Sequence, residues 1–488
     1  MLHKTKSQWN YSYRPVFLAG LILSISILSI GCSKLVEVEP PITSITGASV
    51  YESDATAIAV LTGTYTGISG VGIYGSVGSL SLLPSLSADE LSLYGTNQQY
   101  IYYYQNGLTS TNVNQGDLWY SFYSILFTAN SAIEGIGNSN GMSTAVKNQL
   151  TGEAKFMRAF CYFYLVNLYG DVPLVTGTDF SVNRLLSRTP KATIWQQIES
   201  DLTDAQNLLD ENYLDGTLSN STSERVRPTK WAATSLLSRA YLYQQKWDSA
   251  QIEATKVINN SLLYSLDSLN GVFLKNSSEA IWQLQPVNAG ANTADATLFI
   301  LPSSGPDGYS FPVSLDTLLV NSFEPGDQRR QNWVDSVIAN GITYYYPYKY
   351  KAGYMQPVNN VYPPPTEYTM VFRLGEQYII RAEAEAEKND LTDAAIDLNA
   401  IRGRAGLAAT TAATQADLLN AIYHERQVEL FTEWGHRWLD LKRTGNVTAV
   451  MSVVTPLKGG TWSDYKQLYP IYLYEIQHDP NLVQNSGY

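Results

Sequence analysis

The chain contains two pairs of amphipathic segments, and in each pair a short polar turn separates the two segments. The first pair covers residues 228–245 and 247–260, and the second covers residues 375–388 and 391–404. Alanines lie within the apolar face of every segment, where small side chains let neighbouring helices approach closely. Degenerate helix hairpins of this kind are typical of tetratricopeptide-like repeats, which stack into a curved scaffold. The sequence therefore predicts an all-α fold, an α/α superhelix of helix-hairpin repeats.

The rest of the chain divides into helical and irregular stretches. Apolar residues recur at helical spacing in four further segments, at residues 51–68, 118–137, 144–169 and 190–210. Residues 69–117 are rich in Gly, Ser, Asn and Tyr and lack a clear period, so we expect a long irregular region there. Residues 265–372 combine Pro-Gly punctuation with short apolar runs and the aromatic string ITYYYPYKYKAGY. This pattern predicts a loop-rich, partly β insert.

The N-terminus carries the features of an export signal. Residues 16–30 are uncharged and mostly apolar, but this stretch is shorter than the roughly 20 residues of a membrane-spanning helix. A polar, basic segment precedes it, as in a secretory signal peptide. Gly31 comes directly before Cys32, which resembles the bacterial lipobox and predicts lipidation at Cys32. A lipidated tether at residues 32–50 would then follow a signal peptide at residues 1–31; the alternative is a plain signal peptide with an incidental cysteine.

Composition excludes several classes of protein. The formal net charge is −12, with 32 basic and 44 acidic residues, whereas a nucleic-acid-binding chain carries a basic patch. The two cysteines, Cys32 and Cys161, exclude a disulfide framework, and Cys161 lies in an apolar run typical of a small core residue. Charged residues make up only 16%, while the chain has 35 Tyr and 10 Trp. These side chains present an apolar face with a polar tip and suit surfaces that bind partly polar ligands.

No sequence motif of an enzyme is present. The chain has four histidines, and it lacks an HExxH, a GxSxG, a phosphate-binding GxxxxGK loop and a thiol pair. Glu383, Glu385 and Glu387 lie close together, but a spacing of two fans side chains around a helix, so we expect a solvated acidic face there. We expect four arginines to pair with nearby acids and fix helix packing: Arg402, Arg426, Arg437 and Arg443. The sequence therefore predicts no catalysis, no metal ion and no cofactor.

Seven segments, in order along the chain, resemble the SusD/RagB family. The first holds Trp119, Tyr123, Ile125 and Asn130. The most distinctive are residues 150–174 (LTGEAKFMRAFCYFYLVNLYGDVPL), residues 424–445 (HERQVELFTEWGHRWLDLKRTG) and the tail at residues 468–488 (LYPIYLYEIQHDPNLVQNSGY). Departures are small; Trp434, for example, stands where the family usually has Glu. The resemblance covers nearly the whole mature chain.

The resemblance implies tetratricopeptide-like units that support a more variable binding region. The N-terminal helical part would span residues 51–264, and the C-terminal part residues 265–488, including the insert at 265–372. It also implies a non-catalytic, lipid-anchored protein on the outer-membrane surface of Bacteroidetes, which caps a SusC-type TonB-dependent transporter and delivers a nutrient to it. Three functions stay open: binding a glycan, binding a peptide or protein fragment in the same transport role, and serving as a structural interaction scaffold.

Two segments contain the residue types that a sugar site needs. Sugar rings have apolar C–H faces and hydroxyl edges, so aromatic rings beside Asn or Asp favour glycan binding. In proteins of this family, the region between early helices and a loop of the central insert contribute ligand contacts. The corresponding residues here are Tyr94, Asn97, Tyr100, Tyr102 and Tyr104 in the first segment and Asp307, Tyr309 and Phe311 in the second. In an extended conformation Tyr100, Tyr102 and Tyr104 would share one face; the alternative is that these rings pack against the transporter or beneath the loops.

Overall fold

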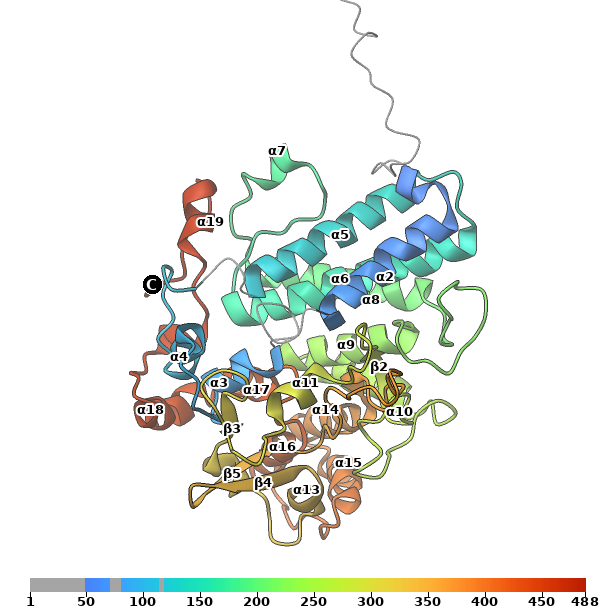
Figure 1. Ribbon diagram of the computed structural model, residues 1–488. Coiled ribbons are helices and arrows are strands. Elements are labelled where there is room, and N and C mark those ends of the chain that lie inside the picture. Colours follow the sequence, from blue (N-terminus) through green and yellow to red (C-terminus); the bar gives the residue numbers. More distant parts are fainter. Residues whose placement is uncertain (1–48, 71–79, 114–117) are drawn as a thin grey trace, which may run out of the picture. The chain divides into compact units, whose positions relative to one another are not determined.

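Helices form most of the chain, and the strands are short (Figure 1). The computed structural model describes residues 49–70, 80–113 and 118–488. The expected signal peptide, the lipidation site Cys32 and nearly all of the tether at 32–50 lie outside these residues and stay predictions. Residues 51–488 form one compact unit. The division of that unit after residue 264 also stays a prediction.

The N-terminal part is a layer of long helices around one central helix. These helices are α2 (Asp54–Gly70), α5 (Leu118–Asn138), α6 (Thr144–Tyr169) and α8 (Lys191–Leu208). α6 packs against the other three, and residues 156–166 within it are all buried. A helix that is apolar all round is buried by its neighbours, which explains this composition and confirms the core position of Cys161. Gly170 ends α6 with a φ of +76°, a conformation that glycine adopts at little cost.

Two helix hairpins pack side by side and form the repeat scaffold. They are α9 (Lys230–Tyr243) with α10 (Trp247–Ile258), and α14 (Leu374–Glu387) with α15 (Leu391–Arg404). α10 packs on α14, and Ala250, Ala254 and Ala384 lie in the buried cluster between the hairpins. α16 (Gln415–Glu429) extends the stack against α14 and α15. The predicted hairpins are confirmed, because the small alanine side chains lie where the helices meet.

The described part of the chain contains three two-stranded antiparallel sheets. They pair β1 (Leu91–Leu93) with β3 (Val313–Leu315), β2 (Ala280–Leu284) with β6 (Thr369–Arg373), and β4 (Val334–Ala339) with β5 (Ile342–Pro347). All of these strands except β1 lie in the insert or at its end. The insert also holds α11 (Ala294–Phe299), α12 (Thr317–Val320) and α13 (Gln328–Asn332). The predicted loop-rich, partly β insert is confirmed, and the β1–β3 pair ties it to the N-terminal part.

The expectation of a long irregular region at residues 69–117 is wrong for the residues that the structure describes there. Residues 80–91 are all buried, and this region includes α3 (Leu83–Ser87), β1 and α4 (Gln98–Tyr104). α3 packs against α17 near the C-terminus, so a distant contact imposes regular structure on a sequence without a clear period. The remaining elements are η3 (Ser49–Glu52), α7 (Phe180–Asn183), α17 (His436–Arg443), α18 (Val447–Leu457), η5 (Asp464–Gln467) and α19 (Leu473–His478).

The expected pairing of arginines with acids is confirmed, and apart from the partly exposed Glu324 the paired side chains are largely buried. The pairs are Arg402 with Glu324, Arg426 with Asp440, Arg437 with Asp89, and Arg443 with both Glu383 and Asp440. The expected solvated face at Glu383 and Glu385 is wrong, because their exposed fractions are 0% and 4%. Arg443 compensates the charge of Glu383, and Gln251 donates a hydrogen bond to Glu385. Buried carboxylates are tolerated when such partners satisfy them.

Candidate functional site

The two segments predicted to bind ligand lie side by side. β1 and β3 pair in register, and the backbone pairing continues beyond the strands. The amides of Tyr94 and Gly95 both donate to the Pro312 carbonyl, at 2.7 and 3.2 Å, and the Thr96 amide donates to the Gly308 carbonyl at 3.2 Å. Thr96 and Gly308 are 212 positions apart in the sequence. The main chain itself therefore holds the two loops together.

Asp307 builds the loop that presents Tyr309. Its Oδ1 accepts hydrogen bonds from the amides of Tyr309, Ser310 and Phe311, at 2.7, 2.6 and 2.9 Å. The amides of Phe311 and Tyr309 lower the pKa of the Asp307 carboxyl, because they stabilise its charged form. The carboxylate is thus engaged by its own loop. The loop leaves Tyr309 85% exposed, and Phe311 is half-buried beside it.

Tyr94 stands beside a ring from a third segment. Its side chain is 42% exposed, and its ring meets that of Tyr344 edge to face, with 5.3 Å between the ring centroids. Tyr344 belongs to β5, which packs beside β3. Such a contact is favourable and holds both rings in place. The aromatic string at residues 342–354 is visible in the sequence, but only the β3–β5 packing selects Tyr344 from it.

Gly95 lets the two loops come this close. A Cβ at this position would lie 2.8 Å from the Cβ of Pro312, which is closer than two carbon atoms can pack. A glycine that follows a short apolar run and precedes a Thr-Asn pair was the available sequence signal for this close backbone approach.

The other predicted residues of the first segment lie on or next to α4, and the expected extended conformation is wrong. Asn97 is the N-cap of α4, and its side chain accepts a hydrogen bond from the backbone amide two residues on, at 2.9 Å. A helix sends the tyrosines in different directions. Tyr100 is 5% exposed, and Tyr102 and Tyr104 are half-buried. The ammonium of Lys458 lies 4.9 Å from the Tyr104 ring centroid. These three rings therefore do not form one aromatic face.

Three partly exposed rings therefore lie on neighbouring segments: Tyr94 and Tyr344 meet ring to ring, and Tyr309 stands on the loop that is hydrogen-bonded to the Tyr94 loop. We call these three rings the tyrosine surface. Hydroxyl groups of Thr96 and Ser310 are exposed on the same two loops. Flat aromatic faces beside hydroxyl groups suit a ligand that has both apolar and polar edges. Within the described residues, no group of three or more His, Cys, Asp or Glu side chains is placed to hold a metal ion.

A helix-repeat scaffold with an inserted, partly β layer that presents aromatic rings defines a class, the helical-repeat binding proteins. Within that class the chain belongs to the SusD family. Residues 53–242 match the SusD-like model described as "Starch-binding associating with outer membrane", and residues 331–488 match the SusD/RagB model described as "SusD family". The resemblance stated from the sequence motifs is confirmed.

Relatives in the family align along most of the chain. A SusD-like protein of Formosa agariphila is 26% identical and covers 94% of this chain and 96% of its own length. A second SusD-like protein of the same organism is 26% identical and covers 85% of this chain and 88% of its own length. No helix in the parts of the chain that the structure describes combines the length and the apolar character needed to cross a membrane.

Solved structures confirm the fold. A SusD superfamily protein from Bacteroides vulgatus superposes with a TM-score of 0.76 at 22% identity, and covers 89% of this chain and 99% of its own. A laminarin-binding SusD-like protein gives a TM-score of 0.71 at 23% identity, over 89% and 98% of the two chains. Surface glycan-binding protein A from Bacteroides thetaiotaomicron gives 0.74 at 19% identity, over 90% and 100%.

Proposed function

We propose that this protein is a non-catalytic, lipid-anchored binding protein of the outer-membrane surface. It captures an oligosaccharide or polysaccharide at the tyrosine surface and delivers it to a SusC-type TonB-dependent transporter. The observation that carries the proposal is that Tyr94 and Tyr344 meet ring to ring while Tyr309 is exposed on the loop that is hydrogen-bonded to the Tyr94 loop. Family membership supports the outer-membrane role. One structural relative is named as laminarin-binding and another as a surface glycan-binding protein.

The chemistry of the tyrosine surface fits a sugar better than a charged ligand. Aromatic rings stack on the apolar C–H face of a pyranose, and the nearby hydroxyls of Thr96 and Ser310 match its hydroxyl edge. Asn97 and Asp307, which are predicted from the sequence to contact ligand, are held by hydrogen bonds to their own loops. Their proposed part is to shape the loops, while the rings make the contact.

The first test removes two rings of the tyrosine surface. The soluble form that lacks residues 1–32 keeps the whole unit at 51–488, so it serves for binding measurements. We expect Tyr94→Ala combined with Tyr309→Ala to weaken glycan binding by about tenfold or more, since about 1.4 kcal/mol of lost stacking has that effect. Affinity electrophoresis and calorimetry with laminarin, starch and other soluble polysaccharides measure the change. Tyr120→Ala is the matched control, because Tyr120 is 53% exposed on α5, a helix that contributes no residue to the tyrosine surface.

Two results would contradict this site or this ligand class. Equal affinity of the double variant and the Tyr120→Ala protein would remove the tyrosine surface from the binding site. Binding of peptides but of no glycan in the same panel would replace the glycan by a peptide ligand. The transporter partnership is tested separately, by affinity purification of the full-length protein from detergent-solubilised outer membranes; the expected result is a co-purifying TonB-dependent barrel, and its absence contradicts the proposed delivery.

A further inference from the structure

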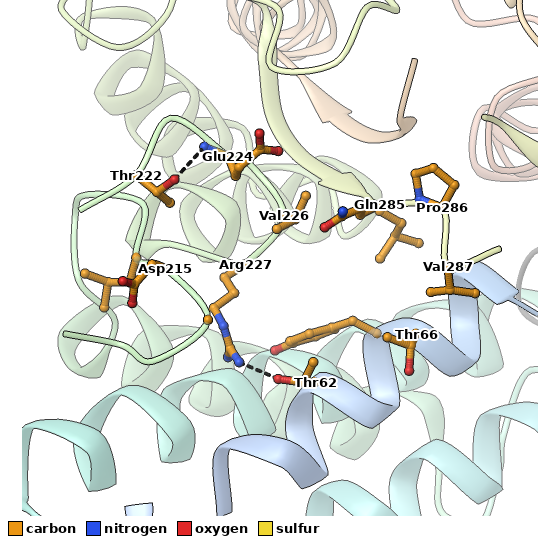
Figure 2. A pocket seen from close by; sticks show the side chains of 14 residues that line it. Thr62, Thr66, Asp215, Thr222, Glu224, Val226, Arg227, Gln285, Pro286 and Val287 are labelled. Carbon is orange, nitrogen blue, oxygen red and sulfur yellow. Dashed lines mark hydrogen bonds between the residues drawn. The ribbon is translucent and has the colours of Figure 1, made fainter. Parts of the chain in front are cut away.

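A pocket of about 620 Å³ lies between three segments that do not contribute to the tyrosine surface. They are the second half of α2, residues 214–227, and the chain that leaves β2 at residues 284–287. Figure 2 shows Thr62 and Gln285 on opposite sides of this space, with Arg227 beside Thr62. The volume falls in the range of pockets that bind small molecules, about 300–1,000 Å³.

One side of the pocket is a closed network of buried polar groups. The Arg227 guanidinium donates to both carboxylate oxygens of Glu153, at 2.9 and 2.7 Å, and to the Thr62 hydroxyl at 2.5 Å. The Tyr65 hydroxyl donates to the same Glu153 carboxylate at 2.8 Å. Glu153 is 0%, Arg227 5% and Tyr65 7% exposed. Because these groups satisfy one another, this side of the pocket is rigid before any ligand arrives.

The part of the wall at residues 214–220 is pre-formed by Asp215. Its carboxylate accepts hydrogen bonds from the amides of Thr217 and Ser219, from the Thr217 hydroxyl and from the Asn220 side-chain amide. The Asn220 and Thr217 side chains contribute most to lowering the pKa of Asp215, because they stabilise the charged form. The loop therefore keeps its shape, and the carboxylate has little capacity left for a cation.

Gln285 combines a fixed main chain with a side-chain amide that is available to a ligand. The Ser69 hydroxyl donates to the backbone carbonyl of Gln285 at 2.5 Å, which fixes the main chain there. The side-chain amide of Gln285 makes no hydrogen bond to another described residue. Pro286 and Val287 place apolar surface next to it. An amide that offers two donors and an acceptor beside apolar carbon is suited to a hydroxyl-bearing ring.

The charges around the pocket decide which ligands it admits. Its ionisable lining residues are Asp215, Glu224 and Arg227. Glu153 neutralises Arg227, Lys275 forms a long, partly exposed ion pair with Glu224 at 3.9 Å, and Asp215 has no cationic partner among the described residues. The wall therefore has an excess of negative charge, which repels anions. The pocket offers a neutral ligand hydroxyl groups, one free side-chain amide and apolar carbon.

We propose that this pocket is a second binding site, which takes a neutral mono- or disaccharide. It is independent of the proposed function, since it shares no residue with the tyrosine surface. Its volume of about 620 Å³ suits a short sugar, whereas the tyrosine surface sets no such limit on length. The Gln285 amide and the Thr66 and Thr222 hydroxyls bind the hydroxyl groups, and Val287 and its neighbours contact the C–H faces.

The test measures small sugars directly on the form that lacks residues 1–32. D-glucose, D-galactose, D-mannose, maltose and cellobiose are screened by saturation-transfer difference NMR, and calorimetry gives the Kd. D-glucuronate is the anionic probe. We expect at least one neutral sugar to bind, and glucuronate to bind at least about tenfold more weakly than that sugar.

Matched tryptophan variants locate the site. Gly216 lines the pocket, and a Cβ there meets no atom within 4 Å, so Gly216→Trp fills the space without a clash at Cβ. We expect it to weaken the sugar at least about tenfold. Gly137→Trp on α5 is the control, since a Cβ at Gly137 also meets nothing within 4 Å, and it keeps the affinity. Thr66→Val with Gln285→Ala, which leaves the backbone unchanged, weakens binding without filling the pocket.

The outcomes separate this site from the tyrosine surface. Tyr94→Ala with Tyr309→Ala is expected to keep the affinity for the small sugar, and circular dichroism checks that every variant is folded. The proposal is overturned if no neutral sugar binds, if glucuronate binds as tightly, or if Gly216→Trp and Gly137→Trp have equal affinity. Loss of the small sugar in the tyrosine double variant alone assigns it to the tyrosine surface and also overturns the second site.

Discussion

Buried guanidinium groups fasten the insert to the repeat scaffold. Arg329 in α13 is 0% exposed and pairs with Glu425 and Glu429 of α16, at 2.5 and 2.9 Å. Arg373 at the end of β6 pairs with Glu429 and Glu433, at 2.5 and 2.8 Å. Burial alone would raise the pKa of Glu429, but the surrounding arginines outweigh it and lower that pKa. Removing one partner would leave an uncompensated buried charge, which is far more costly than breaking a surface pair.

Glu90 is also a buried carboxyl, but unlike Glu429 it has no guanidinium hydrogen-bonded to it. It is 1% exposed, and burial raises its pKa to about 7. Between about pH 4.3, the ordinary glutamate pKa, and about pH 7, the folded chain keeps the proton that the unfolded chain has lost. The stabilisation by this proton is complete below the unfolded pKa and is lost as the pH rises through the folded pKa. We expect the loss of this proton from Glu90 to lower the free energy of unfolding by about 2 kcal/mol when the pH rises from 5 to 7.

Urea denaturation at pH 5, 6 and 7 measures this slope. Glu90→Gln removes the titrating group, so its free energy of unfolding should fall less over this range than that of the unchanged protein. Glu211→Gln is the control at an exposed carboxylate and should leave the slope unchanged. Identical slopes for Glu90→Gln and the unchanged protein would show that Glu90 does not hold a proton in the folded state.

Among the elements, α4 shows how tertiary contacts choose between two local conformations. Tyrosines at positions 100, 102 and 104 alternate as in a strand, yet Tyr100 and Tyr103, three residues apart, are the buried ones. Tyr103 is 0% exposed and meets the ring of Tyr469 edge to face, with 5.2 Å between centroids. A spacing of three places residues on one side of a helix. The distant Tyr469 and the Asn97 cap therefore favour the helix over the extended form.

Two glycines of α5 provide a matched test of helix packing. A Cβ at Gly135 would lie 2.1 Å from a ring carbon of Tyr51, whereas a Cβ at Gly137 meets nothing within 4 Å. Alanine favours a helix over glycine by about 1 kcal/mol, and overpacking costs about 1–3 kcal/mol. We expect Gly135→Ala to lower the free energy of unfolding by about 1–2 kcal/mol and Gly137→Ala to raise it by up to about 1 kcal/mol. Urea denaturation measures both; changes of the same sign would contradict this packing.

For the molecule as a whole, one short strand pair decides where the candidate surface forms. The pairing of β1 with β3 returns the insert to the N-terminal part and places the loop at 307–311 against the loop at 94–97. The helix hairpins and the buried ion pairs hold this layer in place by packing. The exposed rings belong to residues of the layer's own loops. A substitution such as Tyr309→Ala therefore changes the surface without removing a core side chain.

Attachment of the whole molecule to the membrane depends on the expected lipidation at Cys32. A thioether to the lipid requires the cysteine sulfur, and each buried methylene of the acyl chains contributes about 0.8 kcal/mol of membrane affinity. We expect Cys32→Ser to abolish metabolic labelling with an alkyne fatty acid and to release the protein from the membrane fraction. Cys161→Ala, in the buried core, should stay labelled and membrane-bound. Labelling that persists in Cys32→Ser would contradict the predicted anchor site.

The sequence by itself determined the long N-terminal helices, the two helix hairpins and the family. α6 runs from Thr144 to Tyr169, as predicted, because helical periodicity and the glycine that ends the helix are local signals. The hairpins followed from the same kind of signal, and the family followed from seven ordered segments. The sequence also selected both loops of the candidate surface, through the resemblance rather than through any local pattern.

Tertiary structure alone decided which side chains are exposed and which meet. It buried Tyr100 and left Tyr309 exposed, it added Tyr344 to the surface, and it turned the acids of α14 inward toward partners such as Arg443. It also formed the pocket at Gln285 between segments far apart in the sequence. Local sequence patterns indicate the secondary structure of a segment. Exposure, charge compensation and cavities depend on contacts between distant segments, and those contacts exist only in the folded chain.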